Sequence, residues 1–210
     1  DPEHNVLKGQ IMSRMTCMRL LTAHPKVLLE SAHDFGDDTT NRGSGYAKAL
    51  LDAGMLSGLP DSSAKETALV SWAKEVLRES PNNKVVIFSG FKRMLSVLGP
   101  RLSLELSEDH VSITGDTPSI ERQARIDRFN NDPNCRLFFS SDAGAYGVNL
   151  QAGTHLINYD FPWSSGALAQ RVARIDRTSS THEYIDILYM YAVGTVDQYQ
   201  LNVLREKSKV

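Results

Sequence analysis

From residue 84 to the end of the chain, short apolar runs alternate with longer amphipathic stretches, and this alternation constrains the fold more than any other feature of the sequence. The apolar runs predict strands at residues 85–89, 111–114, 136–140, 155–159 and 184–191. The stretches between and after them predict helices near residues 92–98, 118–130, 164–177 and 195–207. Short buried strands that alternate with helices are typical of a parallel sheet covered by helices. The sequence therefore predicts an α/β fold in this part of the chain.

Residues 1–80 lack a strong strand pattern and instead carry helical spacing. The predicted elements are helices at residues 6–21, 46–55 and 63–79, a polar loop at 34–44 and a linker at 54–62. The first helix is expected to end before Pro25, because proline disfavours helical conformation in the residue that precedes it. We therefore expect a helical appendage at residues 1–80, followed by the sheet domain at residues 81–210.

The last part of the helix predicted at residues 164–177 is rich in arginine. A continuous helix turns by about 100° per residue, so it would divide this segment into two faces. The apolar face would pack on the core and consists of Leu168, Val172 and Ile175. The opposite face would carry Gln170, Arg174 and Arg177, and Arg171 would lie between the two faces.

Two guanidinium groups held at fixed positions beside a glutamine suit a polyanionic ligand. The guanidinium group is always charged, and its planar fork matches the oxygens of a phosphate. The residues alone leave a second interpretation open, in which these arginines pair with carboxylates of the chain itself, such as Asp176 or Asp186.

The overall charge is nearly balanced, with 23 basic and 25 acidic residues and a net charge of −2. This balance argues against binding of nucleic acid through bulk electrostatics, although a few amides and hydroxyls can still hold phosphates. Cys17 and Cys135 are far apart and are expected to be reduced core thiols of a cytosolic protein. The six histidines show no metal-ligand spacing and no apolar run is long enough to cross a membrane, so we expect neither a metal site nor a membrane span.

Five segments carry a more specific signal, because they follow one another in a recognisable order. They are Lys84–Phe91, Ile113–Thr117, Glu121–Asn130, Ser140–Gly153 and Gln170–Arg177. In order and spacing this series resembles the second RecA-like lobe of superfamily-two helicases, and more closely that of Swi/Snf-type double-stranded-DNA translocases. The resemblance implies a RecA-like parallel sheet flanked by helices. The stretch Asn158–Trp163, taken with Arg174–Arg177, is most similar to bacterial or phage members, which implies the cytoplasm of a bacterial or phage-infected cell.

Gln170, Arg174 and Arg177 occupy positions of the family's Q-R-x-G-R-x-x-R motif. In the family, the last two arginines are the arginine fingers that reach across a cleft to the γ-phosphate of ATP. The resemblance thus implies catalytic roles for these three residues. The chain departs from the motif at Ala173, where the family has glycine, and alanine is the better helix former.

The resemblance also implies binding residues at the strand ends. Gly147 and Asn149 would lie near the γ-phosphate and the ribose of ATP. Contacts with the phosphates of one DNA strand are implied for Ser89, Gly90, Phe91, Lys92, Thr114, Gly115, Ser140 and Ser141. Small residues at such turns leave backbone N–H groups free for an anion. Taken one at a time, these turns also fit ordinary strand-to-helix connections, and Trp163 fits a core residue better than a wedge against DNA.

The sequence contains neither a G-x-x-x-x-G-K-[ST] phosphate loop nor the Asp-Glu pair that holds magnesium in this family. In the family both belong to the first lobe. The resemblance therefore implies a second motor lobe that is inactive by itself. Its expected partners are double-stranded DNA and an N-terminal RecA-like lobe of the same protein, which would hold most of the ATP and Mg²⁺. The alternatives are a lobe of a strand-separating helicase and a non-catalytic RecA-like module that binds nucleic acid or a protein.

Overall fold

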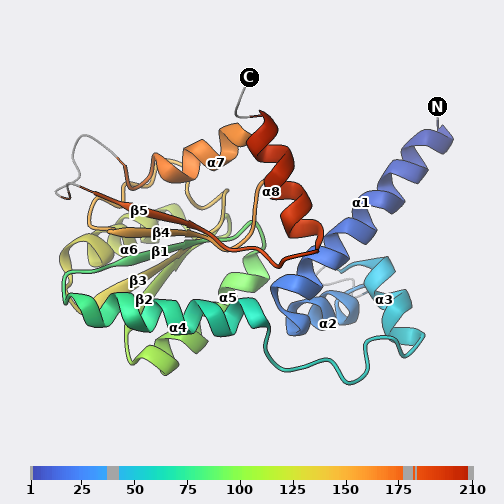
Figure 1. Cartoon of the computed structure of the whole chain (residues 1–210), viewed down its shortest axis with the longest axis horizontal. Coiled ribbons are helices and arrows are strands. Elements are labelled where there is room, and N and C mark those ends of the chain that lie inside the picture. Colours follow the sequence, from blue (N-terminus) through green and yellow to red (C-terminus); the bar gives the residue numbers. More distant parts are fainter. Residues whose placement is uncertain (1, 37–42, 177–181, 183, 208–210) are drawn as a thin grey trace.

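The computed structural model describes residues 2–36, 43–176, 182 and 184–207, and it confirms the predicted α/β class (Figure 1). The strands are β1 (Val85–Phe88), β2 (Asp109–Ile113), β3 (Cys135–Ser140), β4 (His155–Asn158) and β5 (Asp186–Tyr189). They form one parallel sheet in the order β2-β3-β1-β4-β5. The helices are α1 (Pro2–Ala23), α2 (Pro25–His33), α3 (Gly45–Asp52), α4 (Ala64–Glu79), α5 (Lys92–Leu106), α6 (Ser119–Asn131), α7 (Ser165–Val172) and α8 (Val196–Lys207).

The central strand β1 shows why helices cover both faces of the sheet. Its side chains alternate, so that Val85 and Ile87 belong to one buried cluster and Val86 and Phe88 to another. The first cluster is completed by α4 and α5, and the second by α6 and the segment after α7. Because β1 is buried on both sides, all four of its residues are apolar.

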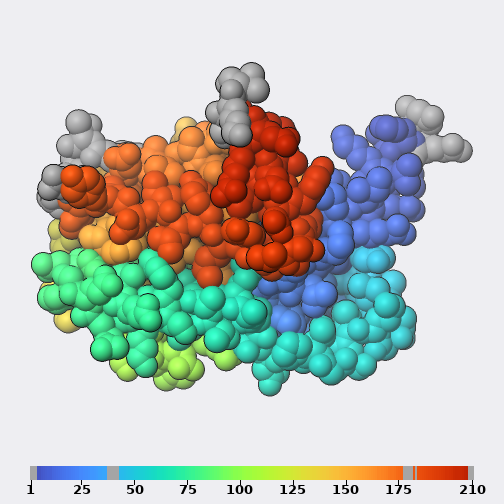
Figure 2. All heavy atoms as spheres, in the orientation of Figure 1, coloured from blue at the N-terminus to red at the C-terminus, as the bar shows by residue number. Residues whose placement is uncertain are grey.

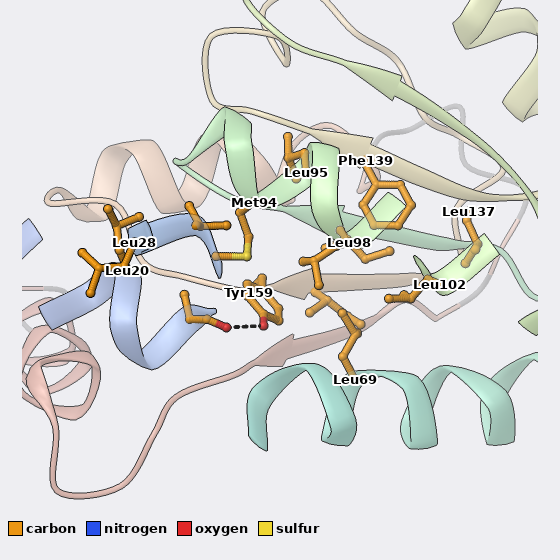
Figure 3. Close-up of a cluster of buried hydrophobic side chains, with 14 of the residues drawn as sticks. Leu20, Leu28, Leu69, Met94, Leu95, Leu98, Leu102, Leu137, Phe139 and Tyr159 are labelled. Atoms are coloured by element: carbon orange, nitrogen blue, oxygen red, sulfur yellow. Dashed lines mark hydrogen bonds between the residues drawn. The ribbon is translucent and has the colours of Figure 1, made fainter. Parts of the chain in front are cut away.

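Helix α4 belongs to this core although it precedes residue 80. Its Leu69 lies in one buried cluster with Leu98 and Leu102 of α5 and with Phe139 of β3 (Figure 3). The packing is therefore continuous across the predicted boundary at residue 80. The division into residues 1–80 and 81–210 stays a prediction. The core continues across this boundary, because α4 packs against α5 and β3 on its other side.

Helices α1, α2 and α3 pack together at one end of the sheet (Figure 1). Tyr159, directly after β4, joins them to the sheet, because its hydroxyl donates a 2.8 Å hydrogen bond to the carbonyl oxygen of Ala23 (Figure 3). Burial raises the pKa of Tyr159, so its hydroxyl remains a donor. The first half of α1 stands clear of the body and exposes Leu7 and Ile11 (Figure 2).

Three helices differ clearly from the sequence prediction: α2 is not predicted, α5 continues to Leu106 beyond its predicted end near residue 98, and α7 ends early. The sequence pattern does not predict α2, although Pro25 at its first turn and a His24 side chain that accepts a hydrogen bond from Lys26 N both favour a helix start. The helix predicted at residues 164–177 ends at Val172. The amides of Arg174 and Ile175 bond to carbonyl groups three residues back, which tightens the chain and ends the regular helix.

Cys17 and Cys135 are buried and form no disulfide, as predicted. Of the helices within the described ranges, none combines the length and the apolar character needed to cross a membrane. Part of the loop predicted at residues 34–44 lies outside the described residues.

Candidate functional site

The carboxyl ends of the parallel strands meet at one edge of the sheet, and this edge carries the residues that were predicted to contact DNA. Ligands of open α/β sheets bind at this edge. It is formed by the turns after β1, β2 and β4 and by the longer loop at residues 141–150 after β3. A backbone hydrogen bond of 3.0 Å from Leu150 N to the carbonyl oxygen of Arg174 joins this loop to the turn after α7.

Arg171, near the end of α7, is the most buried arginine of this edge, with 1% of its surface exposed. Its guanidinium group makes a bidentate pair with Asp142, with bonds of 2.6 Å from Nε and 2.9 Å from Nη2. The Nη1 atom donates to the carbonyl oxygen of Asp160 at 2.7 Å and to Asn158 Oδ1 at 3.1 Å. Burial acts to lower the pKa of Arg171, but the bonds and charges of Asp142 and Asp160 outweigh it and raise the pKa. Arg171 therefore ties the ends of β3 and β4 to α7.

Arg174 lies three residues later in the turn and is in a different environment. Its side chain is half-buried, its Nε atom is buried without a hydrogen-bond partner, and it forms no ion pair within the described part of the chain. Ile175 is fully buried against the sheet and anchors the turn. The interpretation of internal pairing thus applies to Arg171, through Asp142 and Asp160, and not to Arg174.

The predicted single helical face of Gln170, Arg174 and Arg177 is wrong, because α7 ends at Val172. Gln170 is exposed on α7 itself, whereas Arg174 lies in the turn that follows. Arg177 lies outside the described residues. The predicted apolar stripe is only partly correct, since Ile175 is buried while Leu168 and Val172 are half-buried.

The loop with Gly147 and Asn149 directly contacts the turn that carries Arg174. Gly147 has a φ angle of +74°, a conformation that favours glycine. The Oδ1 atom of Asn149 is buried and has no hydrogen-bond partner among the residues described, while its Nδ2 atom lies 3.5 Å from Gln151 Oε1. Two unpartnered polar atoms, Asn149 Oδ1 and Arg174 Nε, therefore belong to two segments that the Leu150–Arg174 bond holds together.

The turn after β1 is engaged internally. Asp160 accepts hydrogen bonds from the Ser89 hydroxyl and, at 2.8 Å, from the Gly90 amide. The Phe91 amide donates to Ser89 Oγ at 3.1 Å. The expectation of free N–H groups at this turn is therefore wrong for Gly90 and Phe91, because a buried carboxylate at the end of β4 needs donors of its own.

The other predicted DNA residues fall into two groups. Ser140 and Ser141 are buried, and their hydroxyl groups bond within the turn, Ser140 to the carbonyl of Ser141 and Ser141 to the amide of Gly144. Gly115 is exposed, and Thr114 is half-buried with its amide bonded to Thr117 Oγ1. Lys92 pairs with Asp116 at 2.6 Å, which connects the turn after β1 to the turn after β2.

Trp163 is not a core residue, contrary to the prediction, because 43% of its surface is exposed. The guanidinium group of Arg19 lies 5.2 Å from the centre of its ring and 4.9 Å from that of Phe91. Arg19 also donates a 2.6 Å bond to the carbonyl oxygen of Phe161. Burial lowers the pKa of Arg19, and the nearby Asp160 opposes this effect.

Sequence reasoning missed the roles of Arg19, Asp142 and Asp160. The clearest available signal was Asp160, an acidic residue between Tyr159 and Phe161 just after β4. It is 1% exposed, and a buried carboxylate needs cations or donors beside it. No comparable signal marked Arg19, which comes from α1. In the described ranges, no group of three or more His, Cys, Asp or Glu side chains is placed to hold a metal ion.

The family described as "Helicase conserved C-terminal domain" matches residues 68–179, just over half of the chain. The DNA repair and recombination protein RAD54B of Mus musculus is 27% identical over 207 residues, which cover 90% of this chain and 22% of the relative. The CHD3-type chromatin-remodeling factor CHR7 of Arabidopsis thaliana is 28% identical, over 95% of this chain and 15% of the relative. A SWI/SNF-related chromatin regulator, subfamily A-like protein 1 of Xenopus laevis, is 30% identical over 64% of this chain and 14% of its own length.

Two solved structures share the fold. The C-terminal part of the Fun30 ATPase domain has a TM-score of 0.64 and 22% identity, over 86% of this chain and 64% of that chain. Domain 2 of the DEAD-box helicase Mss116p, bound to an RNA duplex, has a TM-score of 0.59 and 19% identity, over 70% of this chain and 56% of that chain. The chain spans less than a quarter of the three curated relatives named above. These relatives are eukaryotic and give no support to the predicted bacterial or phage origin.

Proposed function

This chain belongs to the helicase conserved C-terminal domain family, as a superfamily-two lobe of the Swi/Snf type, and from this premise we propose that it is the second motor lobe of an ATP-dependent double-stranded-DNA translocase. In this proposal the lobe supplies an arginine finger and part of the DNA path. A first RecA-like lobe of the same protein supplies the phosphate loop and most of the magnesium site, so the isolated chain hydrolyses little ATP.

The observation that carries the proposal is the state of Arg174. A buried guanidinium nitrogen without a protein partner is costly unless a ligand completes it, because buried polar groups are nearly always hydrogen-bonded. The neighbouring segment carries the acceptor Asn149 Oδ1, which likewise has no hydrogen-bond partner among the residues that the structure describes. A guanidinium group and an amide oxygen suit the phosphate and the sugar hydroxyls of a nucleotide respectively.

Bound ATP would supply the γ-phosphoryl group, whose transfer to water spreads negative charge over the equatorial oxygens. Arg174, held by the buried Ile175 and by the Leu150–Arg174 bond, would stabilise that charge. A positioned arginine of this kind contributes about 10³–10⁵ in rate. Arg177 as a second finger and Gln170 as their neighbour remain part of the proposal, as does Gly147 beside Asn149.

The proposed DNA path runs along the turns after β1, β2 and β3. We assign direct phosphate contacts to Lys92, Thr114 and Gly115, which are half-buried or exposed. The amides of Gly90 and Phe91 are engaged by Asp160 and Ser89, so these two residues would hold the shape of the turn after β1. The buried hydroxyl groups of Ser89, Ser140 and Ser141 would likewise hold the shape of these turns. Contacts through a few amides and hydroxyls suit a chain with a net charge of −2.

The test joins this lobe to a first motor lobe and measures ATP hydrolysis with and without duplex DNA. Arg174→Ala is expected to lower DNA-stimulated turnover by about 10³ or more while DNA binding stays close to wild type. Arg205→Ala, which removes an exposed arginine on α8, is the control for loss of charge. Undiminished turnover in Arg174→Ala would refute the finger assignment.

Displacement of a triplex strand without duplex unwinding would support a translocase over a strand-separating helicase. DNA binding without any hydrolysis would support a non-catalytic module.

A further inference from the structure

Arg122 of α6 bonds to both loops on which the proposed function depends. Its Nε atom donates to the carbonyl oxygen of Thr117 at 3.1 Å, and its Nη2 atom donates to that of Thr114 at 3.1 Å. The Nη1 atom donates, more weakly, to the carbonyl oxygen of Gly144 at 3.4 Å. One side chain thus holds the turn after β2, which carries proposed DNA contacts, and the loop after β3, which carries Gly147 and Asn149.

The two loops are also in close backbone contact at this point. A Cβ atom at Gly144 would lie 2.3 Å from the carbonyl oxygen of Ile113 and 2.8 Å from Thr114 Cα, so no larger residue fits without displacing one of the loops. A Cβ atom at Gly115 would lie 3.2 Å from Ala143 Cβ. A shift of the turn at residues 114–117 therefore displaces the loop at residues 141–150.

We propose that Arg122 is a positioning residue that transmits DNA contact at the turn after β2 to the loop with Gly147 and Asn149, and from there to Arg174. The last step uses the Leu150–Arg174 hydrogen bond of 3.0 Å. This inference rests on the proposed function, and it adds the route by which DNA stimulates hydrolysis. Arg122 is half-buried, and its described hydrogen bonds go to backbone carbonyl groups of the protein. It therefore acts on DNA and on the nucleotide through these two loops.

The chemistry explains why this position requires arginine. Three carbonyl groups in different directions need several donors in a fixed planar arrangement, which the guanidinium group provides. A lysine at the same position has one nitrogen on a flexible stem and cannot hold all three carbonyl groups in one geometry. Arg122→Lys thus keeps the positive charge and removes most of the hydrogen bonds to the three carbonyl groups.

Arg125 provides a matched control on the same helix. It also donates to a backbone carbonyl, that of Ser112 at 2.6 Å, and it pairs with Glu121. Its bonds end on β2 and on α6 itself, so they do not reach the loop after β3. Arg125→Lys therefore tests the loss of an α6 arginine without loss of the proposed connection.

The experiment uses the lobe joined to its first motor lobe and measures ATP turnover without DNA and at saturating duplex DNA. For Arg122→Lys and Arg122→Ala we expect the ratio of the two rates to fall about tenfold, which is within the range seen for residues that carry coupling. Arg125→Lys should leave this ratio within about twofold of wild type. An equal loss of both rates in the Arg122 variants, with an unchanged ratio, would show a merely structural role and overturn the inference.

Hydrogen exchange with and without the DNA duplex gives a second readout that does not depend on turnover. In the wild type, DNA should slow exchange at residues 114–117 and at residues 141–150. In Arg122→Lys, the first effect should persist and the second should disappear. Persistence of both effects would also overturn the inference. A wild-type protein whose turnover does not respond to DNA would instead refute the proposed function, so the two failures are distinguishable.

Discussion

The last turn of α7 and the turn that follows it place two arginines in opposite surroundings. Arg171 is buried with every guanidinium nitrogen bonded to Asp142, Asp160 or Asn158. Arg174, one turn further along, has a buried Nε atom without a partner in the described part of the chain. A buried charge that stabilises the fold needs partners inside the protein. A charge that binds a ligand instead needs atoms that the protein leaves without partners. The same motif thus contains one arginine for the fold and one for the proposed chemistry.

The largest expected effect concerns stability, and it falls on Arg171. Arg171→Ala leaves the carboxylate of Asp160, which is 1% exposed, with far less compensation, and removes the partner of the fully buried Asn158. Breaking a buried ion pair by removing one partner costs about 3–5 kcal/mol, so the free energy of unfolding should fall by about that amount. Urea denaturation followed by circular dichroism measures it.

Arg174→Ala is the matched variant for this measurement. Because its guanidinium group forms no ion pair with the residues that the structure describes, the free energy of unfolding should change by no more than about 0.5–1 kcal/mol. Equal destabilisation by the two substitutions would contradict the distinction between a framework arginine and a ligand arginine.

The sequence could predict the framework on which the two arginines lie, because that part is determined locally. The apolar run of β1 and the spacing of α6 follow from residues close in the chain, whereas α5 continues to Leu106, beyond its predicted end near residue 98. The end of α7 could not be predicted in the same way. The chain tightens where Ile175 packs into the buried cluster on the sheet and Leu150 N bonds to the carbonyl oxygen of Arg174, and only the assembled sheet brings these segments together.

The same reasoning explains the error at Trp163. Its ring is exposed and lies against Arg19, a residue of α1 that no local pattern connects to it. For the candidate site, the resemblance pointed to the edge formed by the carboxyl ends of the strands, which stays a prediction, but it did not indicate which polar groups there are already engaged. Ser89 and Gly90 illustrate this, because the hydroxyl group of Ser89 and the amide of Gly90 already donate hydrogen bonds to Asp160.

A smaller loss of stability is expected for substitution of Asp142, which together with Asp160 neutralises the charge of Arg171. The Asp142 side chain is 39% exposed, so water screens its charge and its loss leaves Arg171 still bonded to Asp160 and Asn158. Asp142→Asn should therefore lower the free energy of unfolding by only about 1 kcal/mol, once solvent screening is considered. The same urea titration checks it. A loss as large as that of Arg171→Ala would show that solvent does not screen the pair of Asp142 and Arg171.

The smallest expected change in stability is at Asn149, on the Arg174 side of the comparison. Because its buried Oδ1 atom has no partner among the described residues, Asn149→Ala should change the free energy of unfolding by no more than about 0.5 kcal/mol. One lost hydrogen bond to a nucleotide is worth about 1 kcal/mol, so KM for ATP in the two-lobed enzyme should rise about fivefold. Asn149→Gln, which keeps the amide oxygen without adding a charge, is the matched control for this rise. An unchanged KM together with a loss of stability above about 2 kcal/mol would make Asn149 a framework residue like Arg171. The loop after β3 would then have no direct part in binding the nucleotide, and Arg174 alone would connect this lobe to it.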